Sequence, residues 1–346
     1  MINNRQKQIL RYVSERGRVT AASIISEISR KVDRVSKPTV LRDLNALLTA
    51  GHIVRKGAGQ SVYYELKTDN ILSRFIDVDA YFQISPEERK IKKNFNWDIF
   101  VQFDGVFTED ERIELEKLNN VYLEKRSKLS TLAFQKEIER LTIELSWKSS
   151  ELEGNTYTLI DTEILIKESR EAPGHNSHEA IMILNHKRAL DYIFSRSEKF
   201  SNVGLADTRG LHAILVKDLD ISDDFRDILV RIVGTEYQPL DNSFQIKEAL
   251  EKALGVINNI SLTPAKALLA ILLLSYVQPF VDGNKRTSRL LATALLIAHN
   301  WCPISWRSVD PAEYKKAMIL FYEQNSLRYF KELFIKQFIF AVKNYF

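Results

Sequence analysis

Three cationic side chains fall at the start of one predicted helix, where positive charge is unfavourable. Arg289 follows Arg286 at i+3 and Lys285 at i+4, so these cations share a face of the helix that follows Gly283. A helix N-terminus carries partial positive charge, which makes cations there destabilising unless an anion lies among them. The free N–H groups of a helix start also bind phosphate readily. The pattern therefore predicts an anion site, with a phosphate chain as its ligand.

Two strongly apolar segments must hold these cations in place. Residues 267–277 and 290–298 predict two buried helices that are joined by a polar loop. Pro279 ends the first helix, and Asp282 or Asn284 can cap the second. The alternative is a capped helix start with three solvated cations. We disfavour it because the loop is enclosed between two buried helices.

The loop resembles the motif of the Fic (filamentation induced by cAMP) family. Residues 278–289 read Gln-Pro-Phe-Val-Asp-Gly-Asn-Lys-Arg-Thr-Ser-Arg, and the family motif is HPFx[D/E]GN[G/K]RxxR. Every position matches except the first, where Gln278 replaces histidine. The resemblance implies a site for ATP and Mg²⁺ in which Asp282 ligates the Mg²⁺. It assigns the nucleotide phosphates to Gly283, Asn284, Lys285, Arg286 and Arg289.

Gln278 stands where the family has its catalytic base. By resemblance, Fic enzymes transfer AMP from ATP to a Ser, Thr or Tyr hydroxyl of a protein, and the histidine accepts the hydroxyl proton. A glutamine amide cannot take up that proton near neutral pH, so we expect a rate loss on the order of 10²–10⁴. Three functions stay open: an impaired protein adenylyltransferase, a nucleotide-binding pseudoenzyme that regulates transcription, and a phosphotransferase of the Doc type, whose loop shares Asn-Lys-Arg-Thr.

A second segment resembles the inhibitory pattern [S/T]xxxE[G/N] of the same family. Ser149, Glu153 and Gly154 occupy its defined positions. In the family this glutamate enters the nucleotide site and pairs with the last arginine of the loop, here Arg289. The resemblance implies autoinhibition by a helix around residues 146–155, which Ser149 steadies, because a carboxylate can take the place of a terminal phosphate. A glycine-capped helix end with a solvated glutamate is the alternative.

A third segment, residues 231–239, resembles the family's flap, a β-hairpin that holds the protein target by strand addition. The resemblance assigns target contacts to Gly234, Thr235 and Tyr237. We expect His212 to be a core histidine rather than a catalyst. Aromatic residues recur near helical spacing beyond residue 320, which predicts core packing, with a homodimer face as the alternative.

The first 66 residues form a basic module of another kind. They hold twelve Lys and Arg against five Asp and Glu, a net charge of +7, which leaves −3 for the rest of a chain whose total is +4. Three short helical patterns followed by two strands resemble a winged helix-turn-helix. Its third helix would present four polar residues to duplex DNA: Lys37, Thr39, Arg42 and Asn45. A protein-interaction or dimerisation domain of the same fold is the alternative.

The composition is that of a globular protein with more than one domain. The chain has 346 residues, of which 45% are apolar and 27% are charged. We predict a mainly α protein: a winged helix domain over 1–66, a connecting region over 67–106, and a helical Fic core with a β-hairpin flap over 107–346. A single cysteine, a polar N-terminus and the lack of any apolar run of about 18 residues predict a cytoplasmic protein without a membrane span.

Overall fold

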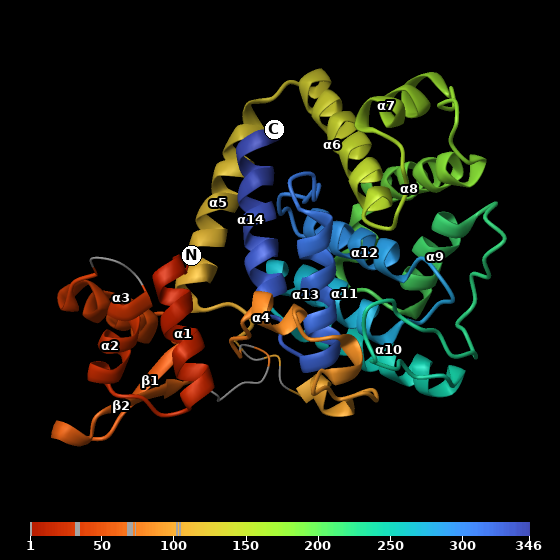
Figure 1. The fold of residues 1–346 in the computed structure, drawn as a ribbon. Coiled ribbons are helices and arrows are strands. Elements are labelled where there is room, and N and C mark those ends of the chain that lie inside the picture. Colours follow the sequence, from red (N-terminus) through yellow and green to blue (C-terminus); the bar gives the residue numbers. More distant parts are fainter. Residues whose placement is uncertain (1, 32–34, 68–71, 73, 102, 104) are drawn as a thin grey trace. The chain divides into compact units, whose positions relative to one another are not determined.

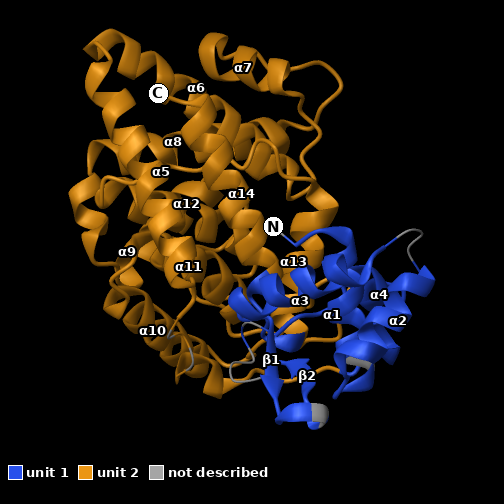
Figure 2. Cartoon of the chain, turned by 90° about the vertical axis from the view of Figure 1, so that its left-hand side faces the viewer, with its two compact units in different colours: residues 1–90, 324–328 blue, residues 91–323, 329–346 orange. Residues whose placement is uncertain are grey.

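The computed structural model describes all residues except 1, 32–34, 68–71, 73, 102 and 104 (Figure 1). Parts of the predicted connecting region therefore lie outside the described residues. The chain divides into two compact units, residues 1–90 with 324–328 and residues 91–323 with 329–346 (Figure 2). The secondary structure is mainly α, as predicted.

The first unit contains three helices followed by a two-stranded antiparallel sheet. These elements are α1 (Asn4–Arg16), α2 (Ala21–Lys31), α3 (Lys37–Thr49), β1 (Ile53–Lys56) and β2 (Tyr63–Leu66). Ile53 pairs with Leu66 in the sheet, and Val19 forms an isolated bridge to Tyr64. The short helix α4 (Val78–Phe82) and the 3₁₀ turns η1 (Gly59–Ser61) and η3 (Pro86–Glu88) complete the described elements of this unit.

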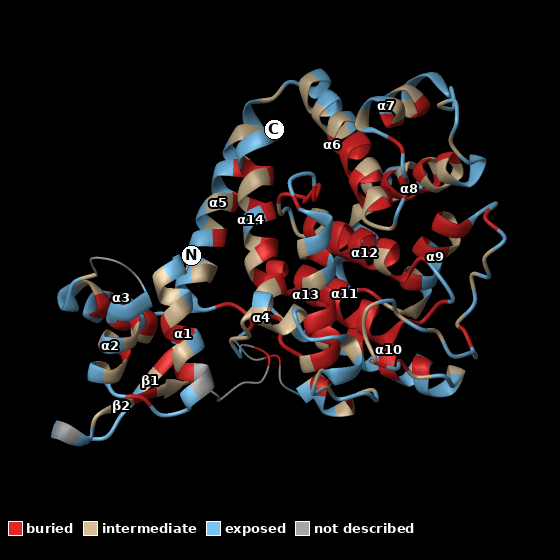
Figure 3. Cartoon of the chain, in the orientation of Figure 1, coloured by how far each residue is buried: buried red, intermediate tan, exposed pale blue. Residues whose placement is uncertain are grey.

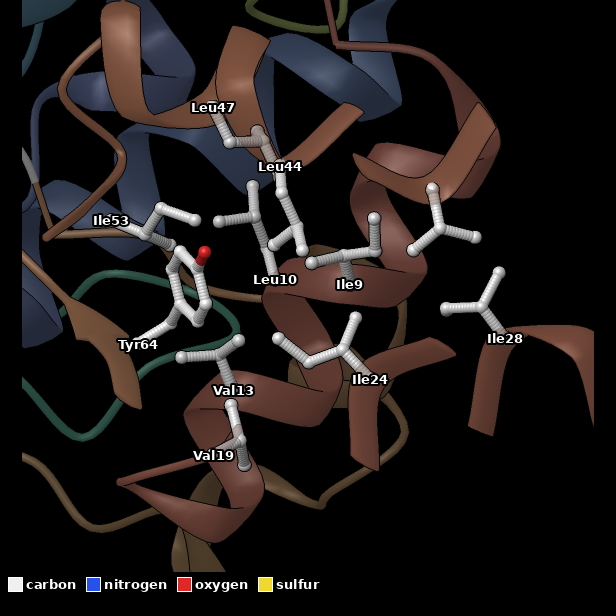
Figure 4. Packing of buried hydrophobic residues seen from close by; sticks show 11 residues of the cluster. Ile9, Leu10, Val13, Val19, Ile24, Ile28, Leu44, Leu47, Ile53 and Tyr64 are labelled. Carbon is white, nitrogen blue, oxygen red and sulfur yellow. The ribbon is translucent and has the colours of Figure 1, made fainter. Parts of the chain in front are cut away.

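A continuous apolar core holds the first unit together (Figure 4). Its side chains lie at helical spacing on α1, α2 and α3, and they meet the inner face of the sheet. The main contributors are Ile9, Leu10, Val13, Ile24, Ile28, Val40, Leu44, Leu47, Ile53 and Tyr64. The order of elements is the one that the sequence predicts.

The regular elements in the described part of the second unit are all helices or 3₁₀ turns. Its helices are α5 (Glu109–Lys128), α6 (Thr131–Glu151), α7 (Leu159–Glu168), α8 (Ser177–Ser195), α9 (Leu205–Val216), α10 (Ser243–Asn259), α11 (Thr263–Val277), α12 (Asn284–Ala298), α13 (Pro311–Gln324) and α14 (Arg328–Asn344), with 3₁₀ turns η4 (Trp97–Val101) and η5 (Ser197–Ser201). The connection between α13 and α14, residues 324–328, is counted with the first unit. Among the described helices, none combines the length and the apolar composition that a membrane span requires.

Helices α11 and α12 form the centre of this unit (Figure 3). Every residue of α11 is buried, and α12 is buried from Arg286 to Leu296. The two helices pack along each other, α10 packs on α11, and α6, α8 and α9 contact α12. Most of the C-terminal aromatic residues are core residues, as predicted. Phe321, Phe330, Phe334 and Phe338 are fully buried, whereas Tyr329, Phe340 and Phe346 are half-buried.

The β-hairpin predicted over residues 231–239 does not form. Val233 and Gly234 make a turn, and Gln238 forms a single parallel bridge with Asn94. Across the residues that the structure describes, the one sheet is β1–β2. The second arm of the expected hairpin is drawn into the helical core by Tyr237, whose ring stacks on that of Tyr276 at 4.7 Å. Core burial of this ring therefore replaces strand pairing.

Candidate functional site

The loop between α11 and α12 turns at two residues with left-handed backbone. Gln278 has φ +52° and Gly283 has φ +77°. A Cβ on Gly283 would lie 3.2 Å from Cε1 of His212, so an alanine there would crowd the ring as well as strain the backbone. The His212 ring stacks on Phe280 at 3.6 Å, and its pKa is lowered to about 4, chiefly by burial. His212 is thus a neutral core residue beneath the loop.

The polar side chains of the loop bind to one another. Asn284 Nδ2 donates to Gln278 Oε1 (2.9 Å) and to Phe280 O (2.7 Å), while Asn284 Oδ1 accepts from the Phe280 N–H (2.9 Å). Gln278 Nε2 donates to Ser275 O at 2.7 Å. Both ends of the Gln278 amide are therefore used to hold the loop in shape.

The start of α12 is not capped by a side chain, so the predicted cap by Asp282 or Asn284 is wrong. Gly283 is the N-cap residue and has no side chain to offer. Asn284 is turned back into the loop, and Asp282 binds Arg286 Nη2 at 3.2 Å. The first N–H groups of the helix consequently have no partner within the helix and can bind a ligand.

A carboxylate lies among the cations at this helix start. Glu153 Oε1 accepts from Arg289 Nη2 at 2.9 Å, and Glu153 Oε2 accepts from Lys285 Nζ at 3.1 Å. Each carboxylate oxygen thus has its own cation. Glu153 follows the end of α6 at Glu151, and the turn that carries it closes at Gly154 with φ +95°.

Arg289 is fully buried and uses all of its guanidinium nitrogens. Nε donates to Ser149 Oγ (2.9 Å), Nη2 also donates to Ser149 O (2.8 Å), and Nη1 donates to Tyr314 Oη (3.2 Å). Burial lowers the pKa of Arg289, but Tyr314 and Glu153 outweigh burial and leave it raised. Ser149 therefore holds the arginine itself. Tyr314, on α13, is a site residue that no local sequence signal indicates.

Arg286 is a buried cation with too few acceptors. Its side chain is 2% exposed, and its Nε and Nη1 have no hydrogen-bond partner in the described part of the chain. His186 on α8 is buried beside it, and both ring nitrogens likewise lack a partner there. The pKa of His186 is lowered by burial, then by the charges of Arg289 and Arg286. Arg286 therefore keeps buried N–H donors that no described acceptor uses.

A cleft of about 590 Å³ opens at this cluster. It is bordered by the turn after α6, the loop, α13 from Pro311 to Tyr322, and residues 230–233. Its polar lining includes Glu153, Asp282, Asn284 and Lys285. A cleft of this size is within the usual range for small-molecule sites.

Asp282 is the loop residue suited to a divalent cation. Its side chain borders the cleft and is 63% exposed. Within the described ranges no group of three or more His, Cys, Asp or Glu could hold a metal ion. Mg²⁺ fits this setting, because it commonly takes one or two carboxylates and completes its shell with water and phosphate oxygens.

The residues predicted to contact a target have different environments. Tyr237 is 2% exposed and its hydroxyl donates to Tyr276 O at 2.8 Å, so it anchors the segment and is not available to a target. Thr235 Oγ1 accepts from the Tyr237 N–H at 3.1 Å, and Gly234 has φ +90°. The large apolar side chain exposed here is Val233, at 78%.

In the first unit, α3 presents three of the four residues predicted to contact DNA. Lys37, Arg42 and Asn45 are exposed. Thr39 is half-buried, and its hydroxyl hydrogen-bonds with that of Ser36 at 2.9 Å.

Comparison with known proteins identifies one part of the second unit. Residues 202–296 match the sequence model of the Fic/DOC family. This range includes α9 to α12 and the loop, but not Glu153. The protein adenylyltransferase Fic of Nematostella vectensis is 26% identical over 218 residues, 59% of this chain and 50% of that protein. That of Drosophila virilis is 31% identical over 210 residues, 58% of this chain and 42% of that protein. The chain thus spans half or less of the length of these curated relatives.

Solved structures of similar fold come from animals and bacteria. Fic-1 from C. elegans (residues 134–508) has a TM-score of 0.61 and 19% identity, covering 68% of this chain and 72% of that chain. A Fic domain containing signaling protein from Bacteroides thetaiotaomicron has a TM-score of 0.57 and 18% identity, covering 66% of this chain and 94% of that chain. These similarities show the fold of about two thirds of the chain.

Proposed function

Because the chain contains a Fic/DOC family domain, we propose that it is a Fic-type protein adenylyltransferase that is restrained by Glu153 and slowed by Gln278. The observation that carries this proposal is the position of Glu153 between Lys285 and Arg289. The Glu153 carboxylate already lies where the spacing of the cations predicts an anion. A nucleoside triphosphate would bring more negative charge to the same donors, so it would compete with the carboxylate.

ATP and Mg²⁺ fit the donors that border the cleft. The N–H groups at the start of α12 and the ammonium group of Lys285 would hold phosphate oxygens, and Asp282 would ligate Mg²⁺. The unpaired N–H groups of Arg286 add donor capacity beneath them. When bound, Mg²⁺ would neutralise charge on the phosphates during transfer.

The missing base limits the chemistry that follows binding. In adenylyl transfer a target hydroxyl oxygen bonds to the α-phosphorus, pyrophosphate leaves, and the hydroxyl proton must pass to a base. Gln278 cannot take this proton, and His212 lies buried against Phe280 beneath the loop. The residues of this chain would therefore bind and orient the nucleotide but accelerate proton removal little.

A nucleotide-binding pseudoenzyme is the second candidate function. The Gln278 amide favours it, because its bonds to Ser275 O and Asn284 Nδ2 preserve the loop without supplying a proton acceptor. Such a protein would couple nucleotide binding to a regulatory output. A Doc-like phosphotransferase, in which the hydroxyl takes the γ-phosphoryl group, is the third candidate. It differs only in the orientation of the nucleotide.

The N-terminal unit would supply the regulatory output by binding duplex DNA in the cytoplasm. Its first 66 residues have a net charge of +7, and α3 exposes Lys37, Arg42 and Asn45. Cations of this kind contact phosphates, and an exposed asparagine can bond a base edge.

Removal of the Glu153 carboxylate tests the nucleotide site. We expect Glu153→Ala to bind ATP·Mg²⁺ about 10-fold to 100-fold more tightly than the natural chain, because breaking a charged hydrogen bond no longer opposes binding. Isothermal titration calorimetry measures the change. Glu168→Ala, at the exposed end of α7, is the matched control and should bind like the natural chain. Equal affinity of the two variants for ATP would show that the Glu153 carboxylate does not compete with ATP.

Restoration of the histidine tests the reaction. Self-labelling from ATP carrying ³²P at the α or γ position would be compared for Glu153→Ala, Gln278→His and the double variant. We expect α label to enter the double variant on the order of 10²–10⁴ times faster than Glu153→Ala. Measurable α label in Glu153→Ala excludes the pseudoenzyme, whereas label that requires histidine supports it. Label from the γ position alone identifies a phosphotransferase, and calorimetry without ATP binding in any variant rejects all three.

A further inference from the structure

Three consecutive carbonyls at the C-terminal end of α11 are bound by side chains from one distant segment. A helix leaves its last carbonyl groups without partners inside the helix. Tyr276 O accepts from Tyr237 Oη at 2.8 Å. Gln278 O accepts from Arg226 Nε at 2.6 Å, and Val277 O accepts from Arg226 Nη2 at 3.4 Å. The end of α11 is therefore completed by Arg226 and Tyr237.

Arg226 forms two further hydrogen bonds, one to Ile228 and one to Pro279. Its side chain is buried, its Nη1 donates to Ile228 O at 2.6 Å, and its backbone N–H donates to Pro279 O at 3.0 Å. Burial lowers the pKa of Arg226 to about 10, so it stays charged near neutral pH. A cation is favourable at the negative end of a helix. One buried side chain thus joins α11, the loop and Ile228.

Residues 228–236, here called the flap segment, are attached to the end of α11 at both of their ends. Arg226 makes the attachment before the segment and Tyr237 makes it after the segment. Between these points Leu229 is 45% exposed and Val233 is 78% exposed, and residues 230–233 border the cleft. The two attachments therefore set where the flap segment lies relative to the loop.

We propose that Arg226 is a positioning residue that links the flap segment to the loop, so that order imposed on the loop by a nucleotide reaches the segment where a target would lie. The proposal rests on the proposed function in two respects, that the loop binds ATP and that a protein target lies on the flap segment. The guanidinium is suited to this task, because its planar fork directs several N–H donors at fixed angles towards separate carbonyls. A lysine keeps the charge but lacks that fork.

Amide hydrogen exchange on the full chain tests the link. The parent would be Glu153→Ala, so that ATP·Mg²⁺ can enter the site. We expect ATP·Mg²⁺ to slow exchange at residues 278–283 and also at residues 228–233. In the Arg226→Lys variant of this parent, ATP·Mg²⁺ should still slow exchange at 278–283 but no longer at 228–233. With ATP·Mg²⁺ present, exchange at 228–233 should then be about 10-fold faster or more than in the parent.

Three comparisons separate this role from a general effect on stability. Amides in α8 and α10 should exchange at the parent rate, and equal acceleration there would overturn the proposal. Tyr237→Phe removes the other attachment and should accelerate exchange at 235–238 while keeping the ATP-dependent slowing at 228–233. Arg226→Gln, which keeps an amide donor without the charge, replaces Arg226→Lys if that variant does not fold. Retained slowing at 228–233 in the Arg226 variant would also reject the link.

Failure of the nucleotide site gives a different result. If ATP·Mg²⁺ slows exchange nowhere in the parent, the proposed function fails. The link is then judged without nucleotide: Arg226→Lys must accelerate exchange at both 228–233 and 278–283 relative to α8. Acceleration at neither segment, or at only one, rejects the link as well.

Discussion

At the start of α12 the two cations that bind Glu153 have different surroundings, and this decides which contact matters more. The Lys285 side chain is 34% exposed, so its ion pair is worth about 1 kcal/mol or less. Arg289 is completely buried, and removal of its partner would leave an uncompensated buried charge. Arg289 therefore dominates the binding of Glu153, and Ser149 and Tyr314 hold its guanidinium ready for an anion.

His212 should make folding stability depend on pH. Its pKa is about 4 in the folded chain and about 6.5 when unfolded, so between these values only the unfolded chain binds the proton. Stability is therefore lost as pH falls through this window, by about 2 kcal/mol between pH 7 and pH 5. His186, whose pKa is also lowered, acts in the same direction.

Between pH 7 and pH 5 we expect His212→Gln to lose about 2 kcal/mol less folding stability than the natural chain. Urea unfolding at the two pH values measures the difference. His178→Gln replaces an exposed histidine on α8 and is the control. An unchanged loss of stability in His212→Gln would mean that His212 is already charged in the folded protein.

At the scale of elements, the loop depends on close contact with α9. Gly283 lies against the His212 ring, and that ring is stacked on Phe280 and cannot move aside freely. Asn284 closes the same turn through both ends of its amide. The turn at Gly283 and Asn284 is therefore held by these contacts before any ligand binds, which reduces the entropy that binding must overcome.

Gly283→Ala should be more destabilising than an alanine at another glycine with positive φ. Gly174 has φ +84° and open space around its would-be Cβ, so Gly174→Ala measures backbone strain alone, about 1 kcal/mol. We expect Gly283→Ala to cost about 1–2 kcal/mol more, because the neighbouring ring must shift. Urea unfolding of both variants gives the comparison. Equal costs would show that the contact with His212 is not tight.

At the scale of the whole molecule, charge and chemistry are divided between two units. The basic surplus lies within residues 1–66, whereas the anion site is built from α6, the loop, α12 and α13. Each unit thus has its own ligand class in the proposed function: duplex DNA for the first and a nucleotide for the second.

Removal of two cations from α3 should weaken DNA binding and its dependence on salt. We expect Lys37→Ala/Arg42→Ala to lower affinity for duplex DNA, and to reduce the slope of log K against log salt by about 2, one for each phosphate that is no longer neutralised. Fluorescence anisotropy at increasing salt measures both quantities. Lys7→Ala/Arg16→Ala removes the same charge from the exposed surface of α1 and is the control. Identical curves for the two pairs would place any DNA contact elsewhere.

Local sequence was sufficient to predict the central helices, the loop between them and the clustering of cations at the start of α12. These features depend on neighbours within a few residues: apolar runs that make buried helices, Pro279 and Gly283 that end and turn them, and charges spaced along one helical face. The resemblance to a family motif added the pairing of Glu153 with Arg289, which are separated by 136 positions along the chain.

Tertiary packing alone decided the rest of the site. Tyr314, His186 and Arg226 reach the site or the loop from α13, α8 and the segment after α9, and the order of residues along the chain does not encode those approaches. The failure of the predicted hairpin has the same origin, since Tyr237 is buried against Tyr276 in the helical core, a contact that no local pattern in residues 231–239 indicates. Periodicity and charge act over a turn of helix, whereas a binding site is completed by surfaces that meet only once the helices have packed.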